Sequence, residues 1–393
     1  MTEWRADDIC PRPETPRPTP ATPLAPPLYP STVWRCASPD DANALMAGEC
    51  DGYAYQRDGH PNADMLADKC RRLHEADHAT ITSSGMAALA LALVSQTGPG
   101  DRVLVSRHVY GKTLQLLESE GRRWGLETER FDPFDEPNCD AALDRSVRLV
   151  VVETVSNPRL RVPDLARLSD RVDRAGGRLL VDNTFASPIL CRPLRHGAHL
   201  VMESVTKMMN GHSDAMLGLL CGRAGTWEAV PRLSATWGFA SSPWDCWLAL
   251  RGLASLHVRM ARACDNAMAI ARMLAAHARV AQVDYPGLET HPDHERARTQ
   301  FADRFGSMVT FTLKGGALAA NRFIEAVRND IPFCPSLGEI STTLSHPQST
   351  SHRGLSETER AELGVSGGTI RLSCGIESTE FVERTLGDAL DAC

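Results

Sequence analysis

Four side chains that could do chemistry stand close together in the middle of the sequence: Asp182, Ser204, Thr206 and Lys207. An amine such as that of Lys207 can add to a carbonyl group. A carboxylate can stabilise a cationic ring, and hydroxyl groups can donate hydrogen bonds to a phosphate. The combination indicates a site for a phosphorylated carbonyl compound that carries a ring cation.

Short apolar runs precede these residues and predict where they lie. Residues 179–181 and 199–202 are apolar and are closed by polar residues, which is typical of buried strands in a parallel sheet. Ligands of such sheets bind beyond the carboxyl ends of the strands. We therefore expect Asp182 and Lys207 at two adjacent strand ends.

Pyridoxal phosphate (PLP) is a cofactor that needs all of these groups. It needs an amine that holds its aldehyde as a Schiff base, an anion opposite its pyridinium nitrogen and donors for its phosphate. We predict Lys207 as the amine, Asp182 as the anion, and Ser204 and Thr206 as donors. For either Lys207 or Asp182 alone, a surface lysine or a turn-capping aspartate would be the simpler interpretation. Their joint position favours the cofactor.

The same stretch resembles the Cys/Met-metabolism (transsulfuration) family of PLP-dependent enzymes. The family patterns D-N-T-F, S-x-T-K and N-G-H-S-D appear at residues 182–185, 204–207 and 210–214. The resemblance continues in the same order from about Pro26 to the C-terminus. One departure is Glu203, which stands where many members have histidine.

The resemblance implies further roles along the chain. Tyr110 stacks on the pyridine ring, and Asn157 bonds both the cofactor hydroxyl and the substrate carboxylate. Gly85 and Met86 hold the phosphate through their amides at the start of an alanine-rich helix, where free N–H groups and the helix dipole favour anions. The expected catalytic residues are Lys207, Tyr110 and Asp182. The expected cofactor-binding residues are Tyr55, Arg57, Gly85, Met86, Tyr110, Asn157, Asp182, Thr184, Ser204, Thr206 and Lys207.

Tyr55 and Arg57 are expected to act on a neighbouring subunit. Two residues that are two apart in an extended segment point to the same side, and together they offer a phenol and a bidentate fork for phosphate. In the family this pair reaches the cofactor phosphate of the adjacent subunit. The resemblance therefore implies a homodimer with shared active sites, and usually a tetramer of two dimers.

The substrate is expected to be an amino acid held by Asn157, Ser336, Arg371 and Lys112. The resemblance assigns Arg371 to the α-carboxylate, which suits a planar guanidinium fork, and places Ser336 near the lysine. Lys112 could meet an anionic leaving group, or it could point to solvent. Ser341 replaces a glutamate of cystathionine-handling members.

These features favour γ-replacement on an activated homoserine, with a γ-lyase that releases a keto acid and ammonia as the close alternative. An aminotransferase on the same fold and a catalytically silent protein on this fold remain as further alternatives. The intact set of Asp182, Lys207 and Arg371 argues against the silent protein.

The expected architecture is the α/β fold of type I PLP-dependent transferases, which resembles aspartate aminotransferase. Apolar runs such as 149–152 alternate with amphipathic segments such as 164–175, which favours a doubly wound parallel sheet. We predict an N-terminal arm over residues 1–60, with about the first 20 disordered. A large parallel-sheet domain should follow at 61–250, and a smaller C-terminal α/β domain at 251–393.

Composition narrows the remaining choices. The net charge of −7 gives no reason to expect nucleic acid or an anionic membrane as a partner. No apolar run is long enough to span a bilayer, and the N-terminus lacks the pattern of a signal peptide. The 12 cysteines include no C-x-x-C pair, so neither a metal site nor a disulfide framework is suggested. A cytoplasmic enzyme is expected.

Overall fold

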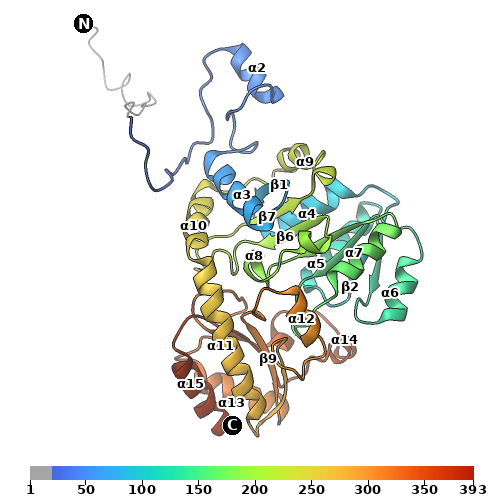
Figure 1. Ribbon diagram of the computed structural model, residues 1–393, viewed down its shortest axis with the longest axis vertical. Helices are drawn as coiled ribbons and strands as arrows, with labels where there is room; N and C mark the ends of the chain where they lie inside the picture. The colour runs from blue at the N-terminus through green and yellow to red at the C-terminus, as the bar shows by residue number, and fades with distance from the viewer. Residues whose placement is uncertain (1–19) are drawn as a thin grey trace.

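A seven-stranded sheet carries the stretch that ends in Lys207. The computed structural model of the chain describes residues 20–393, and in it the strands of this sheet follow the order β1-β7-β6-β5-β4-β2-β3. The strands are β1 (His78–Thr82), β2 (Arg102–Ser106), β3 (Glu127–Phe131), β4 (Leu149–Glu153), β5 (Arg178–Asp182), β6 (Leu200–Ser204) and β7 (Gly218–Gly222). Figure 1 shows this sheet in the upper half of the molecule.

The large sheet is parallel except for one strand. β7 runs antiparallel to both β1 and β6, whereas the pairs among β2 to β6 are all parallel. The predicted large parallel-sheet domain is confirmed, with β7 as its one antiparallel strand. A glycine-rich segment such as Gly218–Gly222 gives a weak strand signal, because glycine is unfavourable inside strands.

Two apolar layers cover the two faces of this sheet. Val150 and Val152 pack into one cluster, and their neighbours Leu149 and Val151 pack into the other. Successive side chains of a strand point to opposite faces, so both faces are buried and the strand reads as a continuous apolar run. This confirms a doubly wound α/β architecture.

Helices supply both layers. α3 and α7 pack into the first layer, and α4 and α5 into the second. The helical segments of this half are α3 (Pro61–His74), α4 (Gly85–Gln96), α5 (Gly111–Gln115), η1 (Leu116–Gly121), α6 (Glu136–Leu143), α7 (Leu165–Arg174), α8 (Ser187–Leu190), η2 (Pro193–His196), η3 (Ala224–Thr226), α9 (Val230–Trp237) and α10 (Pro243–Ala254).

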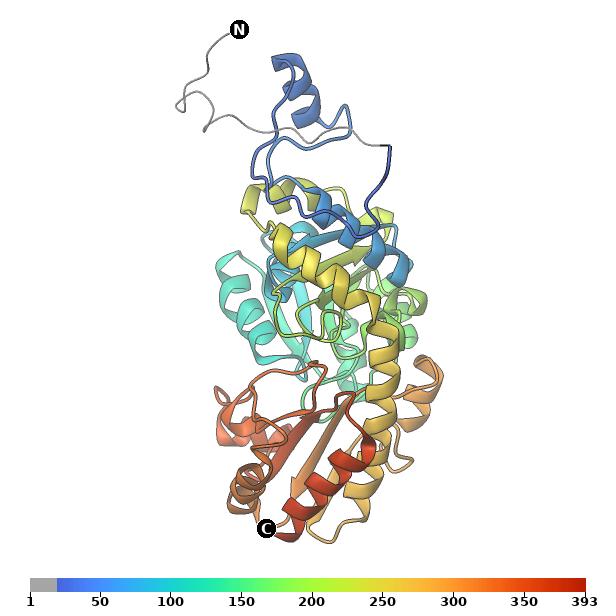
Figure 2. The ribbon, with the colours of Figure 1, turned by 90° about the vertical axis from the view of Figure 1, so that its left-hand side faces the viewer.

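A smaller antiparallel sheet forms the C-terminal half (Figure 2). Its order is β10-β11-β9-β8. The strands are β8 (Val280–Asp284), β9 (Met308–Leu313), β10 (Thr343–Ser345) and β11 (Thr369–Ser373). The helical segments are α11 (Leu256–Ala276), α12 (His294–Gln300), α13 (Gly316–Val327), η4 (Pro347–Ser349), α14 (Glu357–Glu362) and α15 (Thr379–Asp391).

The long helix α11 joins the two halves. Its first turns bury Leu256 and Met260 in the core of the large sheet, whereas Ile270 and Leu274 belong to the core of the small sheet. One helix thus carries two apolar stripes for two cores, which fixes how the halves meet. The boundary at residue 250 falls within α10 and stays a prediction.

An N-terminal arm stands away from the rest of the chain (Figures 1 and 2). It contains α2 (Pro39–Ala47), which has a serine N-cap and a glycine C-cap but buries none of its residues. A helix with no buried face gains little from tertiary packing within its own chain. The predicted disorder of the first 20 residues falls almost wholly outside the described residues.

Two further observations concern the described range. No helix of residues 20–393 is long and apolar enough to cross a bilayer. Every cysteine of the same range is a free thiol.

Candidate active site

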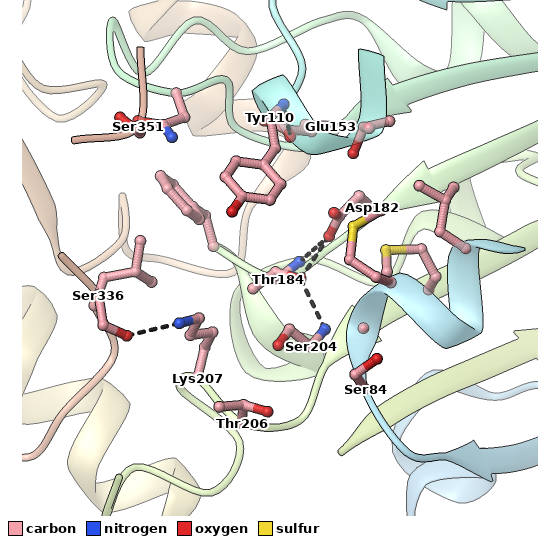
Figure 3. A pocket seen from close by; sticks show the side chains of 18 of the residues that line it. Ser84, Tyr110, Glu153, Asp182, Thr184, Ser204, Thr206, Lys207, Ser336 and Ser351 are labelled. Carbon is pink, nitrogen blue, oxygen red and sulfur yellow. Dashed lines mark hydrogen bonds between the residues drawn. The ribbon is translucent and has the colours of Figure 1, made fainter. Parts of the chain in front are cut away.

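A cavity of about 340 Å³ lies where the large sheet meets the small one. Figure 3 shows it with Lys207, Asp182 and Tyr110 around the same space. The walls include most of the predicted site: Gly85, Met86, Tyr110, Asn157, Asp182, Thr184, Ser204, Thr206, Lys207, Ser336 and Arg371. Residues more than 280 positions apart in sequence thus share one cavity.

Lys207 sits just beyond β6 and reaches across to the small-sheet half. Its Nζ donates a hydrogen bond to the Ser336 hydroxyl at 2.6 Å. Burial, and then the nearby charge of Arg371, lower the pKa of Lys207 from its ordinary value. A lysine that loses its proton more easily is a better nucleophile and base near neutral pH.

Gly338 explains how the Ser336 segment comes so close. Its φ is +81°, and a Cβ there would lie 2.7 Å from the amide nitrogen of Met208 and 2.9 Å from the carbonyl carbon of Lys207. Only glycine allows both this backbone conformation and this approach without strain. The Gly338 amide also donates to the Ser373 hydroxyl at 2.8 Å, which ties the segment to β11.

Asp182 is half-buried at the end of β5 and is held by Thr184. The Thr184 amide and hydroxyl both donate to Asp182 Oδ1, at 3.0 and 2.5 Å. Thr184 Oγ1 in turn accepts from the Ser204 amide at 2.9 Å, which links the ends of β5 and β6. Burial raises the pKa of Asp182 to about 6. Among the described residues no ion pair compensates this carboxyl group.

The N-terminus of α4 forms the end of the cavity predicted to hold phosphate. Ser84 caps the helix by accepting from the Ala87 amide at 3.1 Å. A Cβ on Gly85 would lie 2.9 Å from Ser204 Cβ, so glycine lets the helix start approach the end of β6. Thr206 lines the cavity, but its hydroxyl exchanges hydrogen bonds with the Leu217 backbone.

Arg371 and Asn157 form a buried pair on the opposite wall. The Arg371 Nη1 donates to Asn157 Oδ1 at 2.7 Å, while Arg371 Nε has no partner. Burial lowers the pKa of Arg371 to about 10, so the guanidinium is charged at neutral pH. An unsatisfied donor within a buried, charged guanidinium suits an incoming carboxylate.

Glu153 is a cavity residue that sequence reasoning left without a role. It ends β4 in register with Asp182 on β5, so two carboxyl groups stand side by side at the edge of the sheet. Its Oε1 accepts the Tyr110 amide at 2.6 Å and so fixes the predicted stacking residue. Burial and the neighbouring Asp182 raise the pKa of Glu153 well above its ordinary value. The sequence signal that could have identified Glu153 as a site residue is its position at the end of an apolar run, as for Asp182.

Three predicted residues lie outside the cavity of this chain: Tyr55, Arg57 and Lys112. The segment of Tyr55 and Arg57 is a turn, with the Asp58 amide bonded to the Tyr55 carbonyl at 3.0 Å, so the expected extended conformation is wrong. The Arg57 guanidinium nevertheless lies over the Tyr55 ring, 5.0 Å from its centroid. Lys112 is exposed and donates to Gln115 at 2.8 Å.

The residues present fit PLP. An amine with a lowered pKa, a half-buried carboxyl group without an ion pair and a helix N-terminus occupy three sides of one cavity. These match the aldehyde, the pyridinium and the phosphate of the cofactor. The fold and this site define a PLP-dependent enzyme of fold type I.

Comparison with known proteins gives the family. A family model described as Cys/Met metabolism PLP-dependent enzyme matches residues 14–391. The chain belongs to this family and is a PLP-dependent enzyme of the γ-replacement and γ-lyase class. The predictions of family, fold type, enzyme class and cofactor are confirmed. The roles of single residues stay predictions.

Three proteins with different names are similar to this chain to nearly the same degree. An O-succinylhomoserine sulfhydrylase of Pseudomonas aeruginosa is 36% identical, over 92% of this chain and 89% of the relative. An L-methionine gamma-lyase of Fusobacterium nucleatum is 35% identical, over 94% and 93%. The crystal structure of cystathionine gamma synthase from Xanthomonas oryzae, in complex with aminoacrylate and cysteine, superposes with a TM-score of 0.89 at 35% identity, covering 94% and 93%.

Proposed function

We propose that this chain catalyses γ-replacement on an activated homoserine, with a thiol or sulfide as the nucleophile. The observation that carries this choice is the distribution of acidic groups around the cavity. Among the described residues the only carboxyl groups in its wall are Glu153 and Asp182, which stand next to each other at the sheet edge. The wall therefore lacks a separate anion for the second amino group of cystathionine, and an ester of homoserine has no such group.

The residues divide the work as follows. Arg371 and Asn157 bind the substrate α-carboxylate, and Asp182 keeps the cofactor ring nitrogen protonated. Lys207, with its lowered pKa, takes the α proton and returns protons to the carbon chain. The bound cofactor supplies an electron sink for the negative charge that develops when this proton leaves.

Ser336 is positioned to steer the amine of Lys207. It accepts a hydrogen bond from Nζ at 2.6 Å, and the close approach of Gly338 holds its segment in place. Tyr110, fixed by Glu153, covers the ring. The cavity lies between the halves of the molecule, which limits the access of water to the reacting carbons.

A γ-lyase is the second candidate because much of the cavity wall is apolar. Phe185, Met216 and Leu337 line it beside the polar groups. Such a surface suits the thioether of methionine better than a charged ester. The 35% identity to a methionine gamma-lyase supports the same alternative.

A substrate panel separates the two functions. Holoenzyme is incubated with O-succinylhomoserine, O-acetylhomoserine, methionine and cystathionine, each with and without a thiol. Replacement predicts a new thioether that requires both ester and thiol, with little ammonia. Keto acid and ammonia from methionine without a thiol would favour the lyase. Cystathionine cleavage as the fastest reaction would contradict γ-replacement and favour a γ-lyase with cystathionine in place of methionine as its substrate, and the Lys207→Ala protein gives the background.

We also propose that the enzyme is a cytoplasmic homotetramer built from dimers with shared sites. Helix α2 of the arm buries none of its residues on its own chain, and Tyr55 and Arg57 lie outside the cavity. A second copy could use both features. Mixing inactive Arg57→Ala and Lys207→Ala proteins should then restore activity, because a hybrid dimer contains one intact site. Failure to recover activity after demonstrated subunit exchange would contradict the shared site.

A further inference from the structure

A buried acid–base pair lies on the far face of the strand that leads to Lys207. Glu203 on β6 and His74 at the end of α3 are both fully buried, and Glu203 Oε1 lies 3.1 Å from His74 Nε2. Met202 and Ser204 line the cavity, so the alternation of the strand turns Glu203 to the opposite face. The pair therefore touches neither substrate nor cofactor.

A chain of hydrogen bonds runs from this pair to Asp182. Glu203 Oε1 accepts from Asn183 Nδ2 at 2.8 Å, and Asn183 Oδ1 accepts from the Thr154 hydroxyl at 2.7 Å. The Thr154 amide then donates to the Asp182 carbonyl at 3.0 Å. Asn183 is fully buried and directly follows Asp182, so fixing its side chain also fixes the backbone that carries the carboxylate.

His74 is placed where it can act as the counter-ion of Glu203. It is the one basic side chain of the described residues that forms an ion pair with Glu203. His74 ends α3, where the free carbonyls of a helix favour a cation. The thiols near Glu203 are Cys70, Cys191 and Cys221, and burial raises the pKa of each, so they stay neutral.

The contact between Glu203 and His74 does not have the geometry of a hydrogen bond. Glu203 Oε2 has no hydrogen-bond partner, and the two His74 nitrogens form no well-aligned hydrogen bond. Charge attraction across 3.1 Å does not require such alignment.

We propose that Glu203, with His74 as its counter-ion, is a positioning residue that fixes Asp182 through Asn183 and sets the charge behind the cofactor ring. This rests on the proposed role of Asp182 at the ring nitrogen. It gives a function to the position where many family members have histidine. It also links α3, which directly follows the segment of Tyr55 and Arg57, to the strand that leads to Lys207.

The test uses the absorbance of the bound cofactor in the holoenzyme and the affinity of the apoprotein for PLP. Glu203→Gln keeps an acceptor for Asn183 but removes the charge. A nearby negative charge favours the protonated form of the bound cofactor. The loss of this charge should therefore move the midpoint of the cofactor absorbance, measured against pH, to lower pH. The affinity for PLP should fall by about tenfold, as when an outer partner of a ligand is removed.

A reversed pair guards against loss of the fold. His74→Glu combined with Glu203→His keeps two opposite buried charges but places the cation nearer to Asp182. Its thermal unfolding should stay close to that of the wild type, and its midpoint should move at least as far as that of Glu203→Gln. His277→Gln removes a comparable pair with Asp391, 3.3 Å apart at the surface of the small-sheet half, and should change nothing.

Asp182→Asn separates the role proposed for Glu203 from the role proposed for Asp182. If it changes the midpoint and the affinity for PLP while both Glu203 variants match the wild type, the role of Glu203 is refuted and that of Asp182 stands. If Asp182→Asn changes neither the titration midpoint nor the affinity for PLP, the proposed contact of Asp182 with the cofactor ring nitrogen is refuted. A shift with Glu203→Gln and a larger one with the reversed pair support the positioning role.

Discussion

The two sheets contribute to the cavity in different ways. In the large sheet, Glu153, Asp182 and Ser204 stand at the carboxyl ends of adjacent parallel strands. In the small antiparallel sheet, Arg371 lies in the middle of β11, and Ser336 comes from an irregular segment. Ends of parallel strands meet at one edge, whereas neighbouring antiparallel strands end at opposite edges. A parallel sheet can thus gather a cofactor site from short motifs, and the small sheet must reach it with a long side chain or a loop.

The largest effect is expected where the two halves meet, at Lys207. Lys207→Ala removes the amine that we propose both holds the cofactor and acts as the base. Loss of a positioned acid–base group alone costs roughly 10²–10⁴-fold in rate, so turnover should fall at least that far. Steady-state rates and the absorbance of the purified protein measure both losses. Lys314→Ala, an exposed lysine of the small-sheet half, is the control. Normal activity in Lys207→Ala would overturn the site.

Asp182→Asn tests the large-sheet half of the comparison. An amide cannot hold a protonated ring nitrogen by charge, and hydrogen bonds to charged groups contribute about 1.5–3 kcal/mol, so the rate should fall roughly 10–150-fold. A variant within about twofold of the wild type in rate would contradict the assignment.

The pH dependence of PLP binding sharpens the same point. Burial raises the pKa of Asp182 from 3.8 to about 6, so its contribution to the stability of the protein without cofactor is present below 3.8 and is lost as the pH rises through about 6. A cationic ring offsets this loss. The affinity for PLP, measured by titration of the apoprotein, should therefore rise between about pH 5 and 7. This rise should be weaker in Asp182→Asn.

Arg371→Lys tests the small-sheet half. Lysine keeps the charge but loses the planar fork, so binding of the substrate carboxylate should weaken. Losing one charged hydrogen bond predicts a rise in KM of roughly 10–150-fold, with a smaller change in kcat. The affinity for PLP should stay unchanged, unlike in Asp182→Asn. A parallel loss of PLP affinity would show that the two halves are not separable in this way. Arg322→Lys, an exposed position, is the control.

The smallest effect is expected at Lys112. Its side chain is exposed and donates to Gln115, outside the cavity. If it still attracts an anionic leaving group, Lys112→Ala should raise KM for O-succinylhomoserine by a few-fold, as for exposed ion pairs, and leave KM for O-acetylhomoserine unchanged. The two values can be compared at low ionic strength. Equal effects on both esters would rule out a role in recognising charge.

The residues predicted to bind the cofactor in the large-sheet half could be recognised from local sequence patterns. Asp182 and Lys207 follow apolar runs, and strand burial leaves only the residues just beyond them free to do chemistry. The helix start at Gly85 was visible for the same local reason, as was the helix from Leu165 to Arg174 with Asp164 as its N-cap. In each case the signal is a short stretch of chain whose geometry depends on its own neighbours.

Strand direction and the contacts between residues distant in sequence became visible only in the folded structure. The antiparallel direction of β7 depends on its partners, and the 2.6 Å contact of Ser336 with Lys207 joins residues 129 positions apart. The pairing of His74 with Glu203 arises because α3 lies on the face of the large sheet to which Glu203 points, which no local pattern records. Such contacts depend on how elements that are distant in sequence pack together, so the chain reveals them only once it is folded.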